Sequence, residues 1–272
     1  MKSVRNHKFM GLLTVGILVF LYLPIVNVVA NAFNANEHLL SWGGFTLQWF
    51  EETLTSKEFL NSFSQGLAIA AVVMVISIIV ALSAVVGFRE WGDKAQIFQS
   101  SSMYLRLTLP EIVLVVGTLA IARLLGVNLG APWVVFGQAL IYSAYAMVII
   151  QARLSTIADL YENAAYDLGA TTWRCMKTVV LPLLAPSILV AALMVFTFSL
   201  DSVVSVVFLG GPRTETVPIL IMNMLKKVIT PEVNAIGVVV TLFNLVVLAI
   251  IVKFAGFRSV VSAMGGSSEK AA

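Results

Sequence analysis

The chain has 272 residues, of which 59% are hydrophobic and only 11% are charged. Soluble domains carry about 25% charged residues, so this composition excludes a water-soluble globular protein and indicates an integral membrane protein. The net charge of +3 fits a loop bias toward anionic lipid rather than nucleic-acid binding, and one cysteine, Cys175, excludes an internal disulfide.

Six apolar runs follow one another along the chain, and each is long enough to cross a bilayer, which takes about 20 residues. They cover residues 10–32, 63–88, 104–126, 131–152, 179–209 and 235–257. A barrel would need short strands of alternating polarity, which this pattern lacks, so we predict an all-α protein with six transmembrane helices. We expect the fifth span to bend near Pro182 and Pro186.

The basic residues of the connecting segments predict how these spans are oriented. Most of them lie in the two termini and in the second and fourth loops, which six spans place on the same side of the membrane. We therefore expect a multi-pass protein with both termini in the cytoplasm. These residues are Lys2, Arg5, Lys8, Arg89, Lys94, Arg153, Arg174, Lys177, Lys253, Arg258 and Lys270. We predict a single transmembrane domain over residues 1–258 and a disordered cytoplasmic tail over 259–272.

The loop over residues 210–234 goes against this charge rule with Arg213, Lys226 and Lys227. After its glycines and prolines, the segment ILIMNMLKKVI returns to a semi-apolar helical pattern. It fits either a surface loop or a short helix that dips back over a pathway, and we favour the helix. We expect this loop, with Trp42 and Trp49 of the first external loop, to contact a partner or to gate the mouth of the pathway.

A polar segment at about 155–178 separates the fourth and fifth spans on the predicted cytoplasmic side. Apolar and small residues recur in it every three or four positions, which indicates helix, and Gly169 interrupts this pattern with a turn. We therefore predict a pair of short helices. A helix lying on the membrane is usually basic on its polar face, whereas this segment has both charge signs, so it also fits a protein groove.

Chemistry-bearing residues are few. The two histidines, His7 and His38, are far apart, and neither a nucleophile–base–acid set nor a phosphate-binding loop of the form GxxxxGK[ST] is present. We therefore predict no enzymatic activity, no metal site and no cofactor bound by this chain.

Two acids within the spans are candidate pathway groups, because ionisable residues in a membrane are costly. Asp201 lies in the fifth span and Glu111 in the third. Either acid could instead be satisfied by a neighbouring helix, and Arg106 could pair with Glu111 across one helical turn. Further polar residues fit a pathway or ordinary helix packing, namely Gln138, Tyr142, Tyr145, Ser199, Ser202 and Ser205.

The polar segment resembles the cytoplasmic coupling loop of bacterial ABC importer permeases, whose motif reads EAA, then G after three residues, then IxLP after nine more. Ala164, Ala165, Gly169, Leu181 and Pro182 fall at the matching positions. Val179 replaces the isoleucine and Asn163 the glutamate, while Glu162 comes one residue earlier. The resemblance implies the type I importer permease fold and docking of these residues on a separate ATPase.

Over nearly its full length the chain is also similar to the spermidine/putrescine transporter permeases, particularly the C-type subunit. The matching pieces are YLPIVNVVANAFN, WGGFTLQWF, FTFSLDSVVSVVFLGGP and TPEVNAIGVVVTL. The family often has two adjacent acids in the fifth span, where this chain has Asp201 and Ser202. The resemblance implies that Asp201 and Ser202 line a polyamine pathway, and Glu111 of the third span is our further candidate for it.

The same resemblance implies the other subunits of the transporter. We expect a second, homologous permease, two ABC ATPase subunits that use ATP and Mg²⁺, and an extracytoplasmic solute-binding protein, all at the inner membrane of a bacterium. Alternatives are a permease for another solute, such as ferric iron or thiamine, and a secondary transporter. Secondary transporters often have broken helices at matching positions of two halves, and the sequence indicates no such pair.

Overall fold

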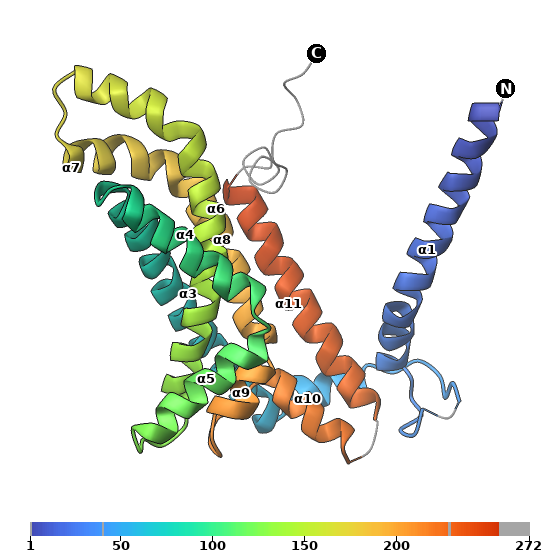
Figure 1. The fold of residues 1–272 in the computed structure, drawn as a ribbon. Coiled ribbons are helices and arrows are strands. Elements are labelled where there is room, and N and C mark those ends of the chain that lie inside the picture. Colours follow the sequence, from blue (N-terminus) through green and yellow to red (C-terminus); the bar gives the residue numbers. More distant parts are fainter. Residues whose placement is uncertain (1, 40, 228–229, 256–272) are drawn as a thin grey trace. The chain divides into compact units, whose positions relative to one another are not determined.

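The computed structural model describes residues 2–39, 41–227 and 230–255 (Figure 1). The regular elements in these ranges are helices, apart from one isolated bridge between Asn34 and Phe45. The predicted all-α class is confirmed. The tail predicted over 259–272 lies outside the described residues.

The chain forms two compact units, each with a core of its own. The first combines Met1–Leu60 with Leu220–Asn244, and the second combines Asn61–Ile219 with Leu245–Ala272.

The first unit contains α1 (Lys2–Ala32), α2 (Gln48–Thr55), most of α10 (Val217–Leu225) and most of α11 (Pro231–Ala255). Every side chain of α1 from residue 10 to residue 30 is exposed, which suits a helix surrounded by lipid or by another subunit. Buried Ala32, Trp49 and Ala235 form a small core.

The loop between α1 and α2 is built around Asn34, whose side chain is 2% exposed. Its Oδ1 accepts hydrogen bonds from the backbone of Asn36 and Gly43, at 3.0 and 2.8 Å, and its Nδ2 donates to the carbonyl of Ser41 at 3.0 Å. The indole of Trp49 donates to the Asn34 carbonyl at 2.8 Å. Trp49 is therefore a structural residue, and of the two tryptophans expected to meet a partner only Trp42 is exposed.

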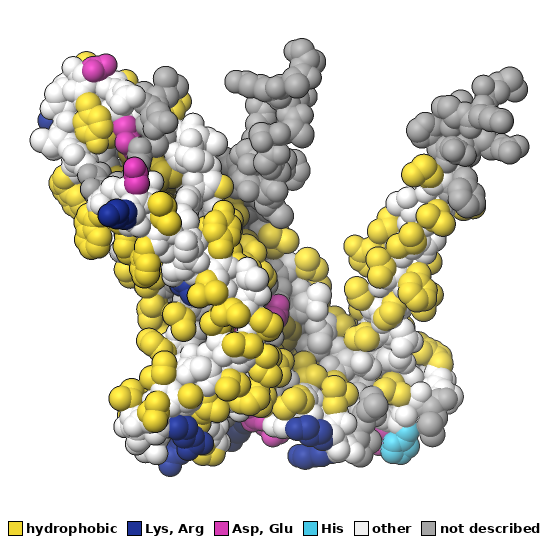
Figure 2. All heavy atoms as spheres, in the orientation of Figure 1, with side chains coloured by type: hydrophobic (Ala, Val, Ile, Leu, Met, Phe, Trp, Pro, Cys, Tyr) yellow, Lys and Arg dark blue, Asp and Glu magenta, His cyan; other side chains and the backbone are white. Residues whose placement is uncertain are grey.

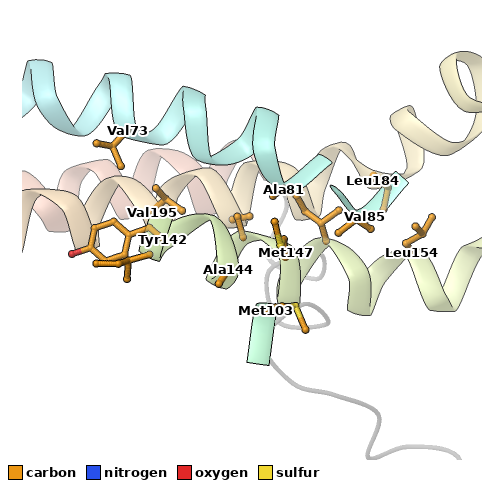
Figure 3. Close-up of a cluster of buried hydrophobic side chains, with 14 of the residues drawn as sticks. Val73, Ala81, Val85, Met103, Tyr142, Ala144, Met147, Leu154, Leu184 and Val195 are labelled. Atoms are coloured by element: carbon orange, nitrogen blue, oxygen red, sulfur yellow. The ribbon is translucent and has the colours of Figure 1, made fainter. Parts of the chain in front are cut away.

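The second unit is a helical bundle arranged around one long central helix, α6 (Ala131–Asp167). In chain order its other main elements are most of α3 (Lys57–Glu90), α4 (Asp93–Thr108), α5 (Glu111–Leu124), α7 (Thr172–Cys175), the π-helical turn η1 (Met176–Val180), α8 (Leu181–Asp201) and α9 (Val204–Leu209). Buried Tyr142, Ala144, Met147 and Leu154 of α6 pack against side chains of α3, α4 and α8 (Figure 3). Small residues allow this close packing, as at Gly137, where a β-carbon would lie 2.6 Å from the Leu209 side chain.

The exterior of the helices is largely apolar (Figure 2). On α3, Val72, Val75 and Ile79 are exposed, while Ser77 and Ala81 on the opposite side are buried. Burying a serine while exposing valine and isoleucine suits a helix whose outer face meets hydrocarbon instead of water.

Five helical stretches among the described residues are long and apolar enough to cross a membrane. They are Met10–Ala32, Lys57–Phe88, Ala131–Ile157, Thr172–Asp201 and Pro231–Ala249. The remaining predicted span, the third, corresponds to the pair α4 and α5, which are bent by 107° at Leu109 and Pro110. The predicted span over 104–126 is therefore interrupted: Pro110 has no amide hydrogen to continue the α4 ladder, and its ring keeps Leu109 extended.

The fifth span is irregular at two places. Pro182 lies within one continuous helical stretch, Thr172–Asp201, and its missing amide coincides with the π-helical turn η1 that directly precedes it. Pro186 lies within α8. A break that the sequence did not predict occurs at Ser202 and Val203, between α8 and α9.

Candidate functional site

Two helix breaks meet in the second unit, and polar side chains fill the place where they meet. Glu111 is the first residue of α5, directly after the break at Pro110, and Ser202 is the extended residue that ends α8. The Ser202 hydroxyl donates to Glu111 Oε1 at 3.1 Å. Two segments 91 residues apart in the chain are thus joined at their irregular points.

A chain of hydrogen bonds extends from this contact into the bundle. The Tyr142 hydroxyl, from α6, also donates to Glu111 Oε1, at 3.3 Å. Ser202 and Ser205 share a hydrogen bond of 2.6 Å across the break. The network therefore connects α5, α6, α8 and α9, and the carboxylate of Glu111 is its charged member.

Gln138 of α6 is fully buried and makes hydrogen bonds on both sides of the break between α8 and α9. Its Oε1 accepts a short hydrogen bond from Ser199 of α8, and its Nε2 donates to Ser205 of α9 at 2.7 Å. One amide side chain thus fixes the end of one helix and the start of the next.

Aromatic rings lie beside the carboxylate. The Tyr142 ring centroid is 5.9 Å from that of Phe198 and 6.5 Å from that of Tyr145, while Tyr145 and Phe198 are edge to face at 5.3 Å. Tyr142 belongs to both the polar network and this aromatic cluster. Tyr145 and Phe198 are only partly buried, so the cluster has accessible ring surface.

Asp201, the last residue of α8, has an exposed side chain. Of the three predicted pathway residues, Glu111 and Ser202 are therefore in direct contact, and Asp201 is adjacent to Ser202 in the chain. Their role in transport stays a prediction.

Arg106 does not lie across one helical turn from Glu111, because the break at Pro110 separates α4 from α5. Its guanidinium donates to the Leu140 carbonyl and to the Ser143 hydroxyl of α6, both at 2.9 Å. The charge of Arg106 thus ties α4 to the central helix. This contact could not be predicted from the sequence, since nothing in the spacing of the two segments indicates it.

The predicted pair of helices with a turn at Gly169 is present (Figure 1). The first arm is the end of α6, which continues to Asp167, and the second is α7 followed by η1. Both arms thus continue the adjacent long helices instead of forming separate short ones. An uninterrupted helix can transmit force on its tip to the bundle as a rigid body.

The turn itself has the geometry of a glycine C-cap. Gly169 has φ +80°, a conformation that glycine adopts without strain. Its amide donates to the Tyr166 carbonyl at 2.8 Å, and the amide of Ala170 donates to Ala165 at 3.0 Å. Thr171 then caps α7 by accepting from the amide of Arg174 at 3.4 Å.

Large apolar side chains are exposed around this turn. Leu168 is 89% exposed and Trp173 is 75% exposed, and Tyr161 and Tyr166 add further exposed ring surface. Between the arms, Ala165 and Cys175 are buried. The hairpin is thus closed on its inside, and its outside presents large apolar side chains among the exposed charges of Asp167, Arg174 and Lys177.

The remaining motif residues divide between the inside and the outside of the hairpin. Asn163, at the position of the motif glutamate, is exposed, as are Ala164 and Pro182, whereas Glu162 is 8% exposed. Val179 and Leu181 are partly buried. Glu162 therefore faces inward, and the neutral Asn163 is the exposed residue at the position of the motif glutamate.

The loop after α9 contains the short helix α10 (Val217–Leu225), so the favoured reading of residues 210–234 as partly helical is correct over this stretch. Gln65 of α3 holds the preceding segment: its Oε1 accepts from the Glu215 amide at 2.6 Å and its Nε2 donates to the Arg213 carbonyl at 3.3 Å.

Comparisons with known proteins agree with this architecture. A family model described as binding-protein-dependent transport system inner membrane component matches residues 82–256. The spermidine/putrescine transport system permease protein PotC of Escherichia coli (strain K12) is 27% identical over 230 residues, which cover 85% of this chain and 87% of that protein. The putrescine transport system permease protein PotI of the same strain is 28% identical over 248 residues, 87% of this chain and 86% of that protein.

Solved structures share the fold. A chain of a bacterial ABC transporter that imports the acidic polysaccharide alginate aligns with a TM-score of 0.67 at 16% identity, covering 95% of this chain and 97% of its own. A chain of an amino acid ABC transporter aligns with a TM-score of 0.60 at 18% identity, covering 78% and 99%.

Proposed function

This chain belongs to the family of binding-protein-dependent transport system inner membrane components, and we propose that it is a permease subunit of an ATP-driven polyamine importer. It forms half of the translocation pathway and works by alternating access. The other half comes from a second, homologous permease.

The observation that carries this proposal is the hairpin of residues 161–178. It combines the coupling motif with an exposed apolar tip, Leu168 and Trp173, on an extension of the central helix α6. Such a tip on a chain without an ATP site implies a separate motor. Two ATPase subunits that use ATP and Mg²⁺ seat the hairpin in a cleft, and their movement swings the spans.

The positions of the partners follow from the predicted orientation. With the hairpin and both termini in the cytoplasm of a bacterium, the loops around Trp42 and around α10 face the outside of the inner membrane, where a solute-binding protein delivers the substrate. The chain binds lipid along its apolar exterior and has no catalytic role of its own.

Polyamines are the proposed substrates for two reasons. The relatives named for spermidine and putrescine transport align over most of both chains. In addition, Glu111 and Asp201 supply negative charge within or beside the third and fifth spans, which suits a cationic solute and opposes an anionic one.

Deleting the ATPase gene in cells that carry the rest of the system tests the importer assignment. We expect uptake of labelled spermidine and putrescine through this system to vanish. Uptake that persists without the ATPase would identify a secondary transporter and would overturn the proposal.

A further inference from the structure

We infer that the π-helical turn η1 is a hinge, so that the two arms of the hairpin transmit the movement of the ATPase unequally. The arm that continues α6 moves the fourth span as a rigid lever, whereas the arm that continues into α8 bends at η1. This inference rests on the proposed function and deepens it, because it names the point at which the docked hairpin changes direction relative to the fifth span.

The two arms differ in their backbone. α6 is one α-helix from Ala131 to Asp167, so nothing interrupts it between the bundle and the tip of the hairpin. The other arm contains η1, where the amide of Leu181 donates to the carbonyl of Met176, five residues earlier. A π-helical turn holds one residue more than the α-helical turn that it replaces, and such turns occur frequently at functional sites.

The sequence explains why the extra residue is held at this place. In an α-helix the ring of Pro182 would clash with the carbonyl of Thr178, four residues earlier, and a wider turn relieves this clash. Thr178, Val179 and Val180 are also β-branched, and branched side chains fit an α-helix less well than unbranched ones. The sequence therefore favours an irregular turn directly before α8.

Packing holds η1 on one side only. Val180 is buried, and Met176 and Val179 pack against the hydrophobic core of the second unit. Lys177 and Thr178 are exposed. A turn that is packed on one side and exposed on the other can change direction by rotating about its packed side, as in the hinge and shear motions of other proteins.

η1 also differs from the other irregular point of the fifth span in how it is held. At the break between α8 and α9, Gln138 of α6 makes hydrogen bonds to Ser199 and Ser205. Within the part of the chain that the structure describes, the side-chain hydrogen bond of η1 is a local one, from the Thr178 hydroxyl to the Arg174 carbonyl at 2.7 Å. The break is thus fixed by a neighbouring helix, and η1 is left to bend.

Distances between spin labels test the hinge in the complete transporter with Cys175→Ala as background. The pair Thr172→Cys and Ala185→Cys spans η1, and the control pair Ser155→Cys and Asp167→Cys lies along α6, all at exposed sites. The labels of each pair are roughly 20 Å apart along the helix. When a hydrolysis-deficient ATPase binds ATP, we expect the distance across η1 to change by about 2 Å or more and the control distance to stay within about 1 Å.

Removal of the extra residue provides a second test. Deletion of Thr178 turns η1 into an α-helical turn and preserves the faces of both arms, so binding of the ATPase should be retained. We expect the number of polyamine molecules taken up per ATP hydrolysed to fall severalfold, because the stiffened arm no longer lets the fourth and fifth spans move separately. Thr178→Ala, which keeps the extra residue, should match the wild type.

The outcomes distinguish the hinge from the proposed function. If ATP changes both distances equally or changes neither, or if the deletion variant has the wild-type ratio, η1 is not a hinge and the importer assignment stands. Loss of ATPase binding in the deletion variant would also overturn the inference, because removing an extra residue preserves the face of the hairpin. A wild-type chain that binds no ATPase would overturn the proposed function, and this inference with it.

Discussion

Ser202 donates a hydrogen bond of 3.1 Å to the carboxylate of Glu111, and the two residues mark the breaks of two different spans. A break within a span exposes backbone groups that must be satisfied inside the protein. Here polar side chains gather at both breaks. That coincidence is why we propose the pathway here.

Asp201 lies at the same break with its side chain exposed. We predict that Asp201→Asn reduces polyamine uptake by several-fold, because one negative charge at the break is lost, while the complex still assembles. Uptake and complex yield are measured side by side, with Asp93→Asn at the exposed start of α4 as the control. Normal uptake by Asp201→Asn would remove this residue from the pathway.

Gln138 holds α8 and α9 together through Ser199 and Ser205. Gln138→Leu should lower the stability of the permease by about 1–3 kcal/mol, because two buried hydroxyls lose their partner. Thermal unfolding in detergent measures this effect. Gln48→Leu, which removes an exposed contact with Glu52, should have little effect. Equal unfolding temperatures for the two variants would show that Gln138 does not support the break.

Gly169 has φ +80°, and a β-carbon there would meet no other atom within 4 Å. Gly169→Ala should therefore act through backbone strain alone, which amounts to about 1–2 kcal/mol. We predict weaker binding of the ATPase to this variant and a milder effect for Gly169→Asn, because asparagine tolerates the left-handed conformation better. The opposite order of the two variants in a pull-down titration would contradict this explanation of the turn.

Trp173 and Trp91 are both 75% exposed, but only Trp173 belongs to the hairpin. If the hairpin is the docking surface, Trp173→Ala should weaken ATPase binding by about 2 kcal/mol, roughly thirtyfold. Trp91→Ala should leave the affinity nearly unchanged. Similar losses for both variants would indicate a nonspecific effect of removing surface tryptophans.

The spans and the turn of the hairpin could be predicted from the sequence, since both depend on local properties. The length of an apolar run can be compared with the thickness of the bilayer, and a glycine such as Gly169 indicates a backbone conformation that few other residues adopt. The break at Ser202 depends instead on distant partners. No proline or glycine marks it, and Gln138 and Glu111, which hold it, come from other helices.

Trp49 shows the same limit. A tryptophan in an external loop suggests a partner surface, but the indole of Trp49 is buried and donates a hydrogen bond to the carbonyl of Asn34, fifteen residues earlier in the chain. Local pattern could not distinguish a buried tryptophan from an exposed one.

The most direct test of the central claim is ATP-dependent uptake of labelled spermidine and putrescine by vesicles that hold the whole complex with its binding protein. A complex with a catalytically dead ATPase is the control. We predict uptake by the active complex and none by the control. A complex that assembles and hydrolyses ATP in response to its binding protein, yet takes up neither polyamine, would contradict the account.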